Sequence, residues 1–146
     1  VADVCDDFLR SELDKKISYD YLTVLSPTAP MRTSEDIKSV QKKLLTERYS
    51  SGLAVTTFSL PVHQAMILEN GQGKKVFPDI FNQRESEVPK YYVDNGSTYS
   101  VKVDNFLENK KLITNNVGLH VMSQDRSIDI DTDYQLELAR YLYKKS

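Results

Sequence analysis

Two short segments carry the side chains that could do chemistry. Residues 26–33 read Ser-Pro-Thr-Ala-Pro-Met-Arg-Thr and follow an apolar, strand-like run. Residues 127–132 read Ser-Ile-Asp-Ile-Asp-Thr and precede a helical pattern. The first segment offers hydroxyls and a guanidinium, and the second offers two carboxylates. Together they predict a site for an anionic, phosphate-bearing substrate that is held through a divalent metal.

The two carboxylates belong to Asp129 and Asp131. In an extended segment, residues i and i+2 point to the same side, so both acids would face one way. Such a pair of hard oxygen ligands suits Mg²⁺, which takes one or two carboxylates and completes its shell with water and phosphates. The alternative is that Asp131 caps the last helix and Asp129 is solvated, and spacing alone favours that alternative.

The loop after the first strand can be interpreted in two ways. In the functional interpretation, Ser26 and Thr28 supply hydroxyls, free backbone N–H groups lie near Ala29, and Arg32 presents a planar fork to a carboxylate or phosphate. In the structural interpretation, the prolines stiffen a turn and Arg32 lies on the surface. Local chemistry does not separate the two, because a loop between a strand and a helix is a usual ligand position.

A third group of polar residues consists of Arg84, Lys90, Asn95 and Tyr99. The pair Asn95-Gly96 is typical of a turn, since both residues tolerate positive φ. A binding role would require the Asn95 amide to face a cleft, and the local pattern favours the turn. The sequence contains no Walker loop and no Gly-x-Gly-x-x-Gly motif.

The elements that would position these residues alternate between helix and strand. Helical spacing of apolar residues covers the first 16 or so positions, and a β-rich run follows at 19–25. Thr33 or Ser34 caps a second helix that carries acids in its first turn, and 52–59 form a second core strand. This order predicts an α/β domain with a parallel sheet covered by helices.

The middle of the chain changes character. Prolines and glycines interrupt residues 61–103, which we expect to form an extended β region with a hairpin turn at 70–73. Strands at 91–93 and 97–103 are predicted on either side of a turn at 94–96. Another strand follows at 117–122, and Thr132 caps a final helix whose tyrosines and leucines, Tyr134 and Tyr143 included, pack inward.

Composition limits the class of protein. The 146 residues suit one domain, and 19 basic against 21 acidic residues give a net charge of −2. That balance gives no reason to expect a nucleic-acid or membrane partner, and no apolar run approaches the roughly 20 residues of a membrane helix. The single cysteine, Cys5, rules out an internal disulfide and fits a reducing compartment, so we expect a cytoplasmic protein.

Taken in order, these motifs resemble the acylneuraminate cytidylyltransferases, also called CMP-sialic acid synthetases. That family has a Gln-Pro-Thr-Ser-Pro-Leu-Arg-Thr run before a Glu-Asp-Ile helix, then Pro-x-x-Tyr, then Asn-Gly-x-x-Tyr, and finally Asp-Ile-Asp-Thr before the last helix. The matching positions here are 26–33, 35–37, Pro89 and Tyr92, 95–99, and 129–132. The likeness spans nearly the whole chain. Ser26 replaces the usual Gln, and Ala29 replaces a frequent Ser.

The resemblance implies a Rossmann-like, mostly parallel sheet with helices on both faces, of the nucleotide-diphospho-sugar transferase type. It also implies an Mg²⁺-dependent transfer of CMP from CTP to a nonulosonic (sialic-type) acid, with release of pyrophosphate. Asp129 and Asp131 would hold the metal, and Asp131 and Arg32 would be catalytic. The substrate would be bound by a set of six residues, namely Ser26, Thr28, Ala29, Arg32, Asn95 and Tyr99. The extended 61–103 region would support a homodimer.

The family also opens with a strand and a loop rich in glycine and basic residues that grips the nucleotide phosphates, and this sequence has no such segment. We therefore expect residues 1–146 to be an N-terminally truncated, single cytidylyltransferase domain that is inactive alone. Two alternatives are a related nucleotidyltransferase for another sugar acid, and a non-catalytic remnant that serves as an assembly module.

Overall fold

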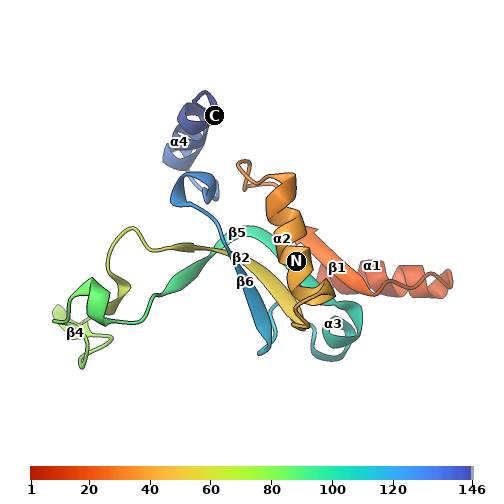
Figure 1. Ribbon diagram of the computed structural model, residues 1–146, viewed down its shortest axis with the longest axis horizontal. Helices are drawn as coiled ribbons and strands as arrows, with labels where there is room; N and C mark the ends of the chain where they lie inside the picture. The colour runs from red at the N-terminus through yellow and green to blue at the C-terminus, as the bar shows by residue number, and fades with distance from the viewer. Residues whose placement is uncertain (146) are drawn as a thin grey trace. The chain divides into compact units, whose positions relative to one another are not determined.

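The computed structural model describes residues 1–145, which form two compact units. The first unit comprises residues 1–56 and 94–145, and the second comprises 57–93. Figure 1 shows the elements in chain order, which are α1 (Ala2–Asp14), β1 (Tyr21–Leu25), α2 (Ser34–Leu45), β2 (Ser51–Thr57), β3 (Met66–Glu69), β4 (Gln72–Lys75), β5 (Tyr92–Lys102), α3 (Val103–Asn109), β6 (Val117–Val121) and α4 (Asp133–Tyr143). The described residues also form three short 3₁₀ helices, one of them at Gln124–Arg126. No described helix is both long enough and apolar enough to cross a membrane.

A four-stranded sheet with the order β1-β5-β2-β6 forms the centre of the first unit. β2 and β6 are parallel, with Ser51 opposite Val117, whereas β1 and β5 are antiparallel, with Leu25 opposite Thr98. The α/β class is therefore confirmed, but the sheet is mixed and not mostly parallel as predicted. A crossover helix indicates that the two strands it connects run parallel. The chain reaches β5 from the second unit and not through such a helix, so the rule does not apply to β5.

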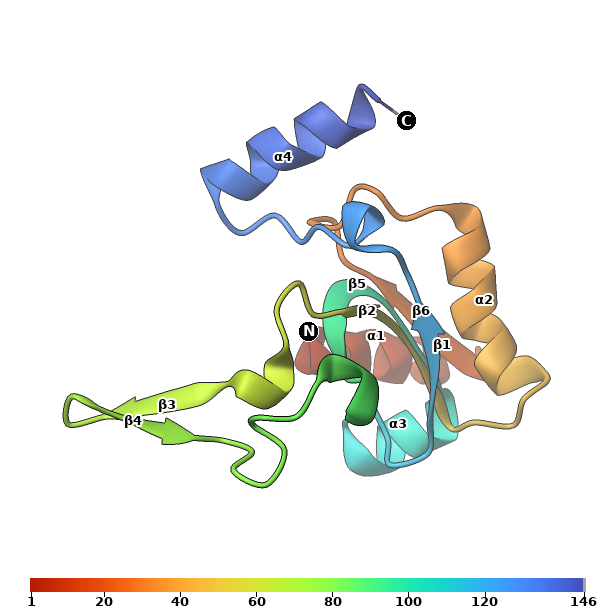
Figure 2. The same cartoon turned by 60° about the vertical axis from the view of Figure 1, so that its left-hand side comes forward.

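Helix α2 packs closely on β2 and β6 (Figure 2). A Cβ at Gly52 would lie 2.6 Å from the Val40 carbonyl oxygen, and one at Gly118 would lie 2.6 Å from the Tyr49 ring. Real Cβ contacts are almost never that short, so these two glycines allow the close approach of helix and sheet. Val40 of α2 forms a buried cluster there with Ala54 and Met122.

The other main hydrophobic cluster joins α1 and α3 to the sheet. Its buried members are Cys5, Leu9, Val101, Val103 and Phe106. Leu22 and Val24 of β1 pack against the same cluster. By contrast, Thr23 of β1 bonds to Gln41 of α2, so alternate residues of the strand face opposite helices. Helices thus cover both faces of this sheet.

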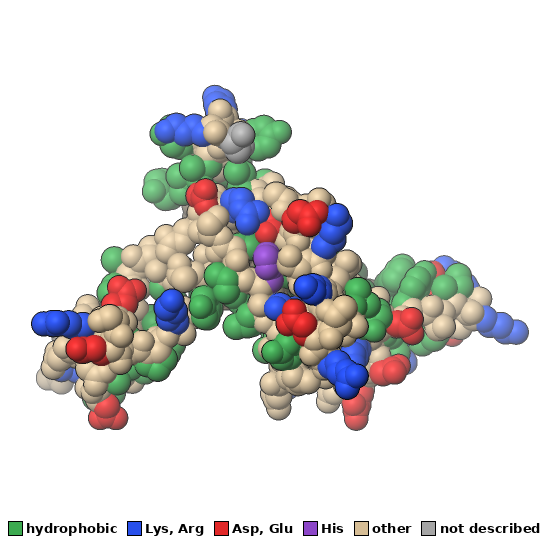
Figure 3. Space-filling view, viewed as in Figure 1, with side chains coloured by type: hydrophobic (Ala, Val, Ile, Leu, Met, Phe, Trp, Pro, Cys, Tyr) green, Lys and Arg blue, Asp and Glu red, His purple; other side chains and the backbone are tan. Residues whose placement is uncertain are grey.

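Local capping signals place the starts of two helices correctly. Thr33 and Asp36 form a capping box at the start of α2, and the Thr132 side chain accepts the Gln135 N–H at the start of α4. The predicted inward packing of α4 holds only for a narrow stripe that contains buried Ala139. Tyr134 and Tyr143 are 76% and 72% exposed, and Figure 3 shows hydrophobic side chains on the surface of this helix.

The turn predicted at 94–96 is wrong, because β5 runs unbroken from Tyr92 to Lys102. The Asp94 carboxylate accepts the Gly96 N–H at 2.9 Å, and the Asn95 side-chain oxygen accepts the Ser97 N–H at 3.2 Å. Gly96 has φ +67°. These side-chain bonds produce a local bend inside the strand where the sequence indicates a hairpin turn.

The second unit contains the antiparallel hairpin of β3 and β4. Its strands pair from Met66 opposite Lys75 to Glu69 opposite Gln72, and Gly71 at the turn has φ +79°. The hairpin thus lies where the glycine pattern predicts it. Several of its apolar side chains are exposed, with Leu68 at 77% and Ile67 at 51%.

Candidate functional site

The two segments singled out in the sequence meet in the structure. The Thr28 hydroxyl donates a hydrogen bond of 2.5 Å to Oδ1 of Asp129, across 101 positions of sequence. The Ile130 N–H also donates to the Thr28 carbonyl at 2.9 Å. A backbone bond and a side-chain bond therefore fix the Asp-x-Asp segment to the loop that follows β1.

The hydroxyls of this loop form a hydrogen-bonded chain with one direction. The Ser26 and Thr28 side-chain oxygens lie 2.7 Å apart. An ionised carboxylate only accepts, so Thr28 uses its single proton on Asp129. Ser26 must then donate to Thr28. The Ser26 oxygen keeps its remaining acceptor capacity and has no second proton to give.

A cavity of about 580 Å³ lies beside the hydrogen-bonded hydroxyls of this loop. We call it the strand-end cavity, because it opens where β1 stops. Its lining includes Leu25, Ser26, Gly96, Tyr99, Lys111 and Asp129. The volume falls in the range of roughly 300–1,000 Å³ that is usual for small-molecule sites. The Asp129 carboxylate, the Lys111 ammonium group and the Ser26 hydroxyl oxygen therefore line one cavity that is large enough for a sugar.

Gly96 makes room for the Asp129 carboxylate. A Cβ at this position would lie 2.2 Å from Oδ2 and 2.7 Å from Cγ of Asp129. With φ at +67°, the backbone also favours glycine. The bend in β5 therefore has a role, because it brings a residue without a side chain against Asp129.

Gly96→Ala is expected to destabilise the protein by about 2 kcal/mol more than Gly71→Ala. Both glycines have positive φ, but nothing lies within 4 Å of a Cβ at Gly71. The matched pair thus separates the clash with Asp129 from the cost of the backbone conformation. Urea unfolding of both variants measures the difference. Equal losses would mean that Asp129 moves aside freely.

Tyr99 places a phenol in the same cavity. Its hydroxyl donates to the Asp94 carboxylate, with distances of 3.0 and 2.9 Å to the two oxygens. Burial raises the pKa of Tyr99 well above its ordinary value, and the hydrogen bond to Asp94 raises that pKa further. The phenol therefore stays protonated at neutral pH, and Tyr99 acts as a neutral polar group with an aromatic face.

Arg32 holds the 26–33 loop in place through hydrogen bonds to backbone carbonyls. Its Nη1 donates to the Ser26 carbonyl at 3.0 Å and to the Ser97 carbonyl at 2.7 Å, which ties the loop to β5. Arg32 does not line the strand-end cavity; it lines a different one, described below. Ala29 is buried, with 3% of its surface exposed. In this structure both residues support the loop, and their predicted substrate contacts remain predictions.

The Asn95 side chain is buried, with 4% exposed. Its Nδ2 donates to the Ser127 hydroxyl at 3.0 Å and lies 3.2 Å from the Met122 sulfur. These contacts hold β5 against the segment that leads to Asp129. Asn95 therefore does not face the cavity here, and its contact with a sugar also remains a prediction.

Asp131 is exposed, and its backbone N–H donates to the Gln135 side chain at 2.9 Å. Within residues 1–145, no group of three or more His, Cys, Asp or Glu could hold a metal ion. A magnesium site here would thus rely on the carboxylates of Asp129 and Asp131, completed by water and phosphate oxygens. All of these are hard oxygen donors, so the donor set fits Mg²⁺.

A buried ionic cluster behind the loop was missed by sequence reasoning. Asp36 is 2% exposed, and its carboxylate accepts from His120 at 3.0 Å and from Arg126 at 2.6 Å. It also accepts the Thr33 N–H and hydroxyl at 2.9 and 2.7 Å. Burial alone would raise the pKa of Asp36, but these hydrogen bonds hold it well below its ordinary value. The sequence shows only the capping-box signal for Asp36.

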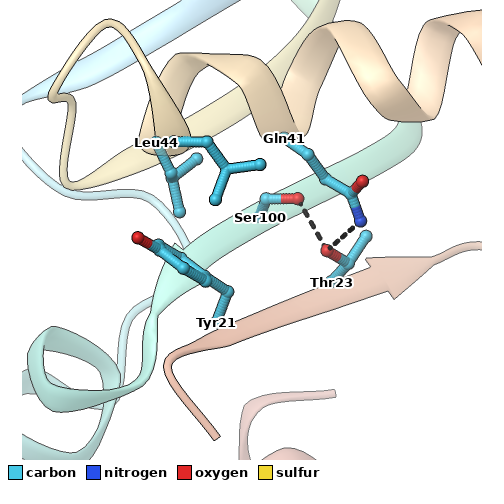
Figure 4. Close-up of a pocket in the computed structure, with 6 residues that line it drawn as sticks. Tyr21, Thr23, Gln41, Leu44 and Ser100 are labelled. Carbon is cyan, nitrogen blue, oxygen red and sulfur yellow. Dashed lines mark hydrogen bonds between the residues drawn. The ribbon is translucent and has the colours of Figure 1, made fainter.

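A smaller hollow of about 160 Å³ lies between β1 and α2 (Figure 4). Its polar groups bond to one another, because the Thr23 oxygen lies 2.9 Å from the Ser100 oxygen and accepts from Gln41 at 3.2 Å. The other lining residues include Tyr21 and Leu44. This hollow offers a ligand little polar chemistry and belongs to the packing of α2 on the sheet.

Comparison with known proteins gives three informative similarities. The chain is 30% identical over 141 residues to the post-translational flagellin modification protein B of Campylobacter coli, covering 96% of this chain and 60% of that protein. It is 32% identical over 138 residues to the CMP-N,N'-diacetyllegionaminic acid synthase of Campylobacter jejuni, covering 94% and 58%. It is 28% identical over 127 residues to the pseudaminic acid cytidylyltransferase of the same species, covering 86% and 55%.

The chain therefore spans somewhat more than half the length of the curated relatives that it matches. No family model matches the sequence.

Proposed function

The chain belongs to the acylneuraminate cytidylyltransferase family, and from this premise we propose that residues 1–146 form the sugar-acid and metal side of a CMP transfer. CTP would be the donor, a nonulosonic acid the acceptor, and pyrophosphate the second product. The relatives include enzymes named for pseudaminic acid and for N,N'-diacetyllegionaminic acid, so the acceptor class is proposed at the level of nonulosonic acids.

The contact between Thr28 and Asp129 is the observation that carries the proposal. It joins the loop after β1 to the Asp-x-Asp segment at the edge of the strand-end cavity. In an α/β sheet, ligands bind at the carboxyl ends of strands, where this cavity lies. We also propose that the sheet is part of a Rossmann-like fold of the nucleotide-diphospho-sugar transferase type, which would explain why the site lies at this edge.

In this proposal, Asp129 and Asp131 hold Mg²⁺. When bound, the ion neutralises charge on the phosphates and so favours attack on phosphorus. Ser26 accepts a hydrogen bond from the sugar acid, and Thr28 keeps the Asp129 carboxylate oriented. Lys111 provides a positive charge for the carboxylate of the acceptor. Arg32 acts through its bonds to the Ser26 and Ser97 carbonyls, which fix the floor of the cavity.

We further propose that the protein is cytoplasmic and forms a homodimer through the second unit. The support for the dimer is the β3–β4 hairpin, whose Leu68, Ile67 and Met66 side chains are 77%, 51% and 54% exposed. A two-stranded hairpin alone is marginally stable in water, so a partner surface would stabilise it. Light scattering on the purified protein would measure its mass, and a monomer at micromolar concentration would rule this part out.

The direct test is an assay of the product of the complete reading frame that contains this sequence. The protein would be incubated with CTP, Mg²⁺ and, in turn, pseudaminic, N,N'-diacetyllegionaminic and N-acetylneuraminic acids. Pyrophosphate release that depends on one of these acids is the expected result. No release with any of them would favour the alternative, a non-catalytic assembly module of the same fold.

A further inference from the structure

A second large cavity, of about 480 Å³, lies between the 30–33 loop, the 3₁₀ helix at Gln124–Arg126 and the end of α4. We call it the C-terminal cavity. Its lining includes Met31, Arg32, Arg126, Leu142, Tyr143 and Lys145. Of these residues, none lines the strand-end cavity. The proposed CMP transfer gives this second cavity no role.

Three cationic side chains line this cavity from three separate parts of the chain, and among residues 1–145 two of them have no carboxylate partner. Arg126 is paired with buried Asp36. Within residues 1–145, Arg32 forms no ion pair, and its one bonded nitrogen is satisfied by two backbone carbonyls. In the same part of the chain, the Lys145 ammonium group lies over the Tyr141 ring, 4.5 Å from its centroid, and has no carboxylate partner.

The lining also includes one acid, Asp125, so positive charge exceeds negative charge around the cavity. Arg32 is only partly exposed, which makes its uncompensated charge costly in the absence of an anion. A guanidinium presents several N–H donors in a plane, and this fork matches the oxygens of a phosphate. The Lys145 ammonium adds a compact point charge at the end of a long side chain. This combination suits a doubly charged phosphate group better than a neutral ligand.

Apart from Thr33, the remaining side chains that line the cavity are apolar or aromatic. Pro30, Met31 and Leu142 lie beside the Tyr143 ring. The volume exceeds what a bare inorganic ion would fill and lies in the usual range for small organic ligands. The ligand should therefore carry an organic body in addition to its charge.

We propose that the C-terminal cavity binds a phosphomonoester, with the phosphate on Arg32 and Lys145 and the organic body against Met31 and Tyr143. This site does not require the proposed CMP transfer, although its Arg32 also fixes the floor of the strand-end cavity. The bonds of Arg32 to the Ser26 and Ser97 carbonyls place the phosphate site directly behind the loop of the strand-end cavity.

Phenyl phosphate is a suitable probe, because it combines a dianionic phosphate with an aromatic ring. Its binding would be measured by calorimetry at fixed ionic strength, in the absence of CTP and metal, for the wild type, Lys145→Glu and Lys144→Glu. Lys144 is the matched control, since it is exposed and adjacent but does not line the cavity. Circular dichroism would verify that both variants stay folded.

The expected result is saturable binding that Lys145→Glu weakens about tenfold or more, a loss of about 1.4 kcal/mol, whereas Lys144→Glu leaves it within about twofold. Phenol should not compete for the site. Equal weakening by the two variants would indicate only general electrostatic attraction, and absence of saturable binding in the wild type would overturn the proposal, as would competition by phenol. Each result stands whether or not the protein transfers CMP.

Discussion

Asp129→Asn should lower the rate of the proposed CMP transfer by about 10²–10³-fold while the free energy of unfolding stays nearly unchanged. Asparagine keeps the shape of the side chain and an oxygen that can accept the Thr28 proton. It removes the negative charge that would hold the metal in the proposed site. The measurement is pyrophosphate release at saturating CTP and sugar acid, with urea unfolding in parallel.

Asp133→Asn provides the control for this prediction. Asp133 is an exposed acid in the first turn of α4, four residues beyond Asp129, and it lines neither of the two large cavities. Its loss of charge should leave the rate unchanged and cost at most about 1 kcal/mol of stability through the helix dipole. Wild-type rates for Asp129→Asn would remove that residue from the proposed metal site.

The largest effect on stability is expected for Asp36→Asn. The substitution leaves the Arg126 guanidinium beside a buried neutral amide and replaces a charged acceptor for His120 and Thr33. Breaking a buried ion pair in this way typically costs about 3–5 kcal/mol. Chemical unfolding at pH 7 should therefore show a loss of about 3 kcal/mol or more.

Glu35→Gln is the matched control, because Glu35 occupies the same helical turn but pairs with Lys38 on the surface. Glu35→Gln should lower the free energy of unfolding by less than about 0.5 kcal/mol. The difference in the free energy of unfolding between the wild type and Asp36→Asn should also depend on pH. Since the pKa of Asp36 is lowered by folding, its contribution is complete above the ordinary value of 3.8 and is lost as the pH falls below it. A gap that is constant down to pH 3 would contradict this account.

The parts of the fold that follow from local chemistry could be predicted from the sequence. Thr33 and Asp36 signal the start of α2 because a capping box needs only residues three apart, and Thr132 does the same for α4. The hairpin at Gly71 is likewise a local signal. By contrast, the Asn95-Gly96 pair looks like a turn locally, and its role inside β5 depends on Asp129, which lies more than thirty residues away in the chain.

The candidate site could be predicted only in part, for the same reason. Residue types predicted that Asp129 and the 26–33 loop belong to one site, but no pattern predicted the hydrogen bond between Thr28 and Asp129 that joins them in the structure. Substrate contacts were predicted for Arg32 and Asn95, but the sequence pattern could not show which other residues hold these side chains. In the structure, Arg32 donates to the Ser26 and Ser97 carbonyls, and Asn95 donates to the Ser127 hydroxyl. The Asp36 cluster joins positions 84 and 90 residues apart, and no local pattern marks such pairs.

Ser26 donates its hydrogen bond to Thr28, and Thr28 donates to Asp129. This fixed direction of donation has a consequence for ligand selectivity. A ligand atom beside Ser26 must bring its own hydrogen, as an alcohol or an amide does. A methyl ether or a ketone there would set lone pairs against lone pairs and be rejected without any steric clash. The glutamine usual in the family can turn either end of its amide outward, so in the proposed site this serine would narrow the range of sugar acids that fit.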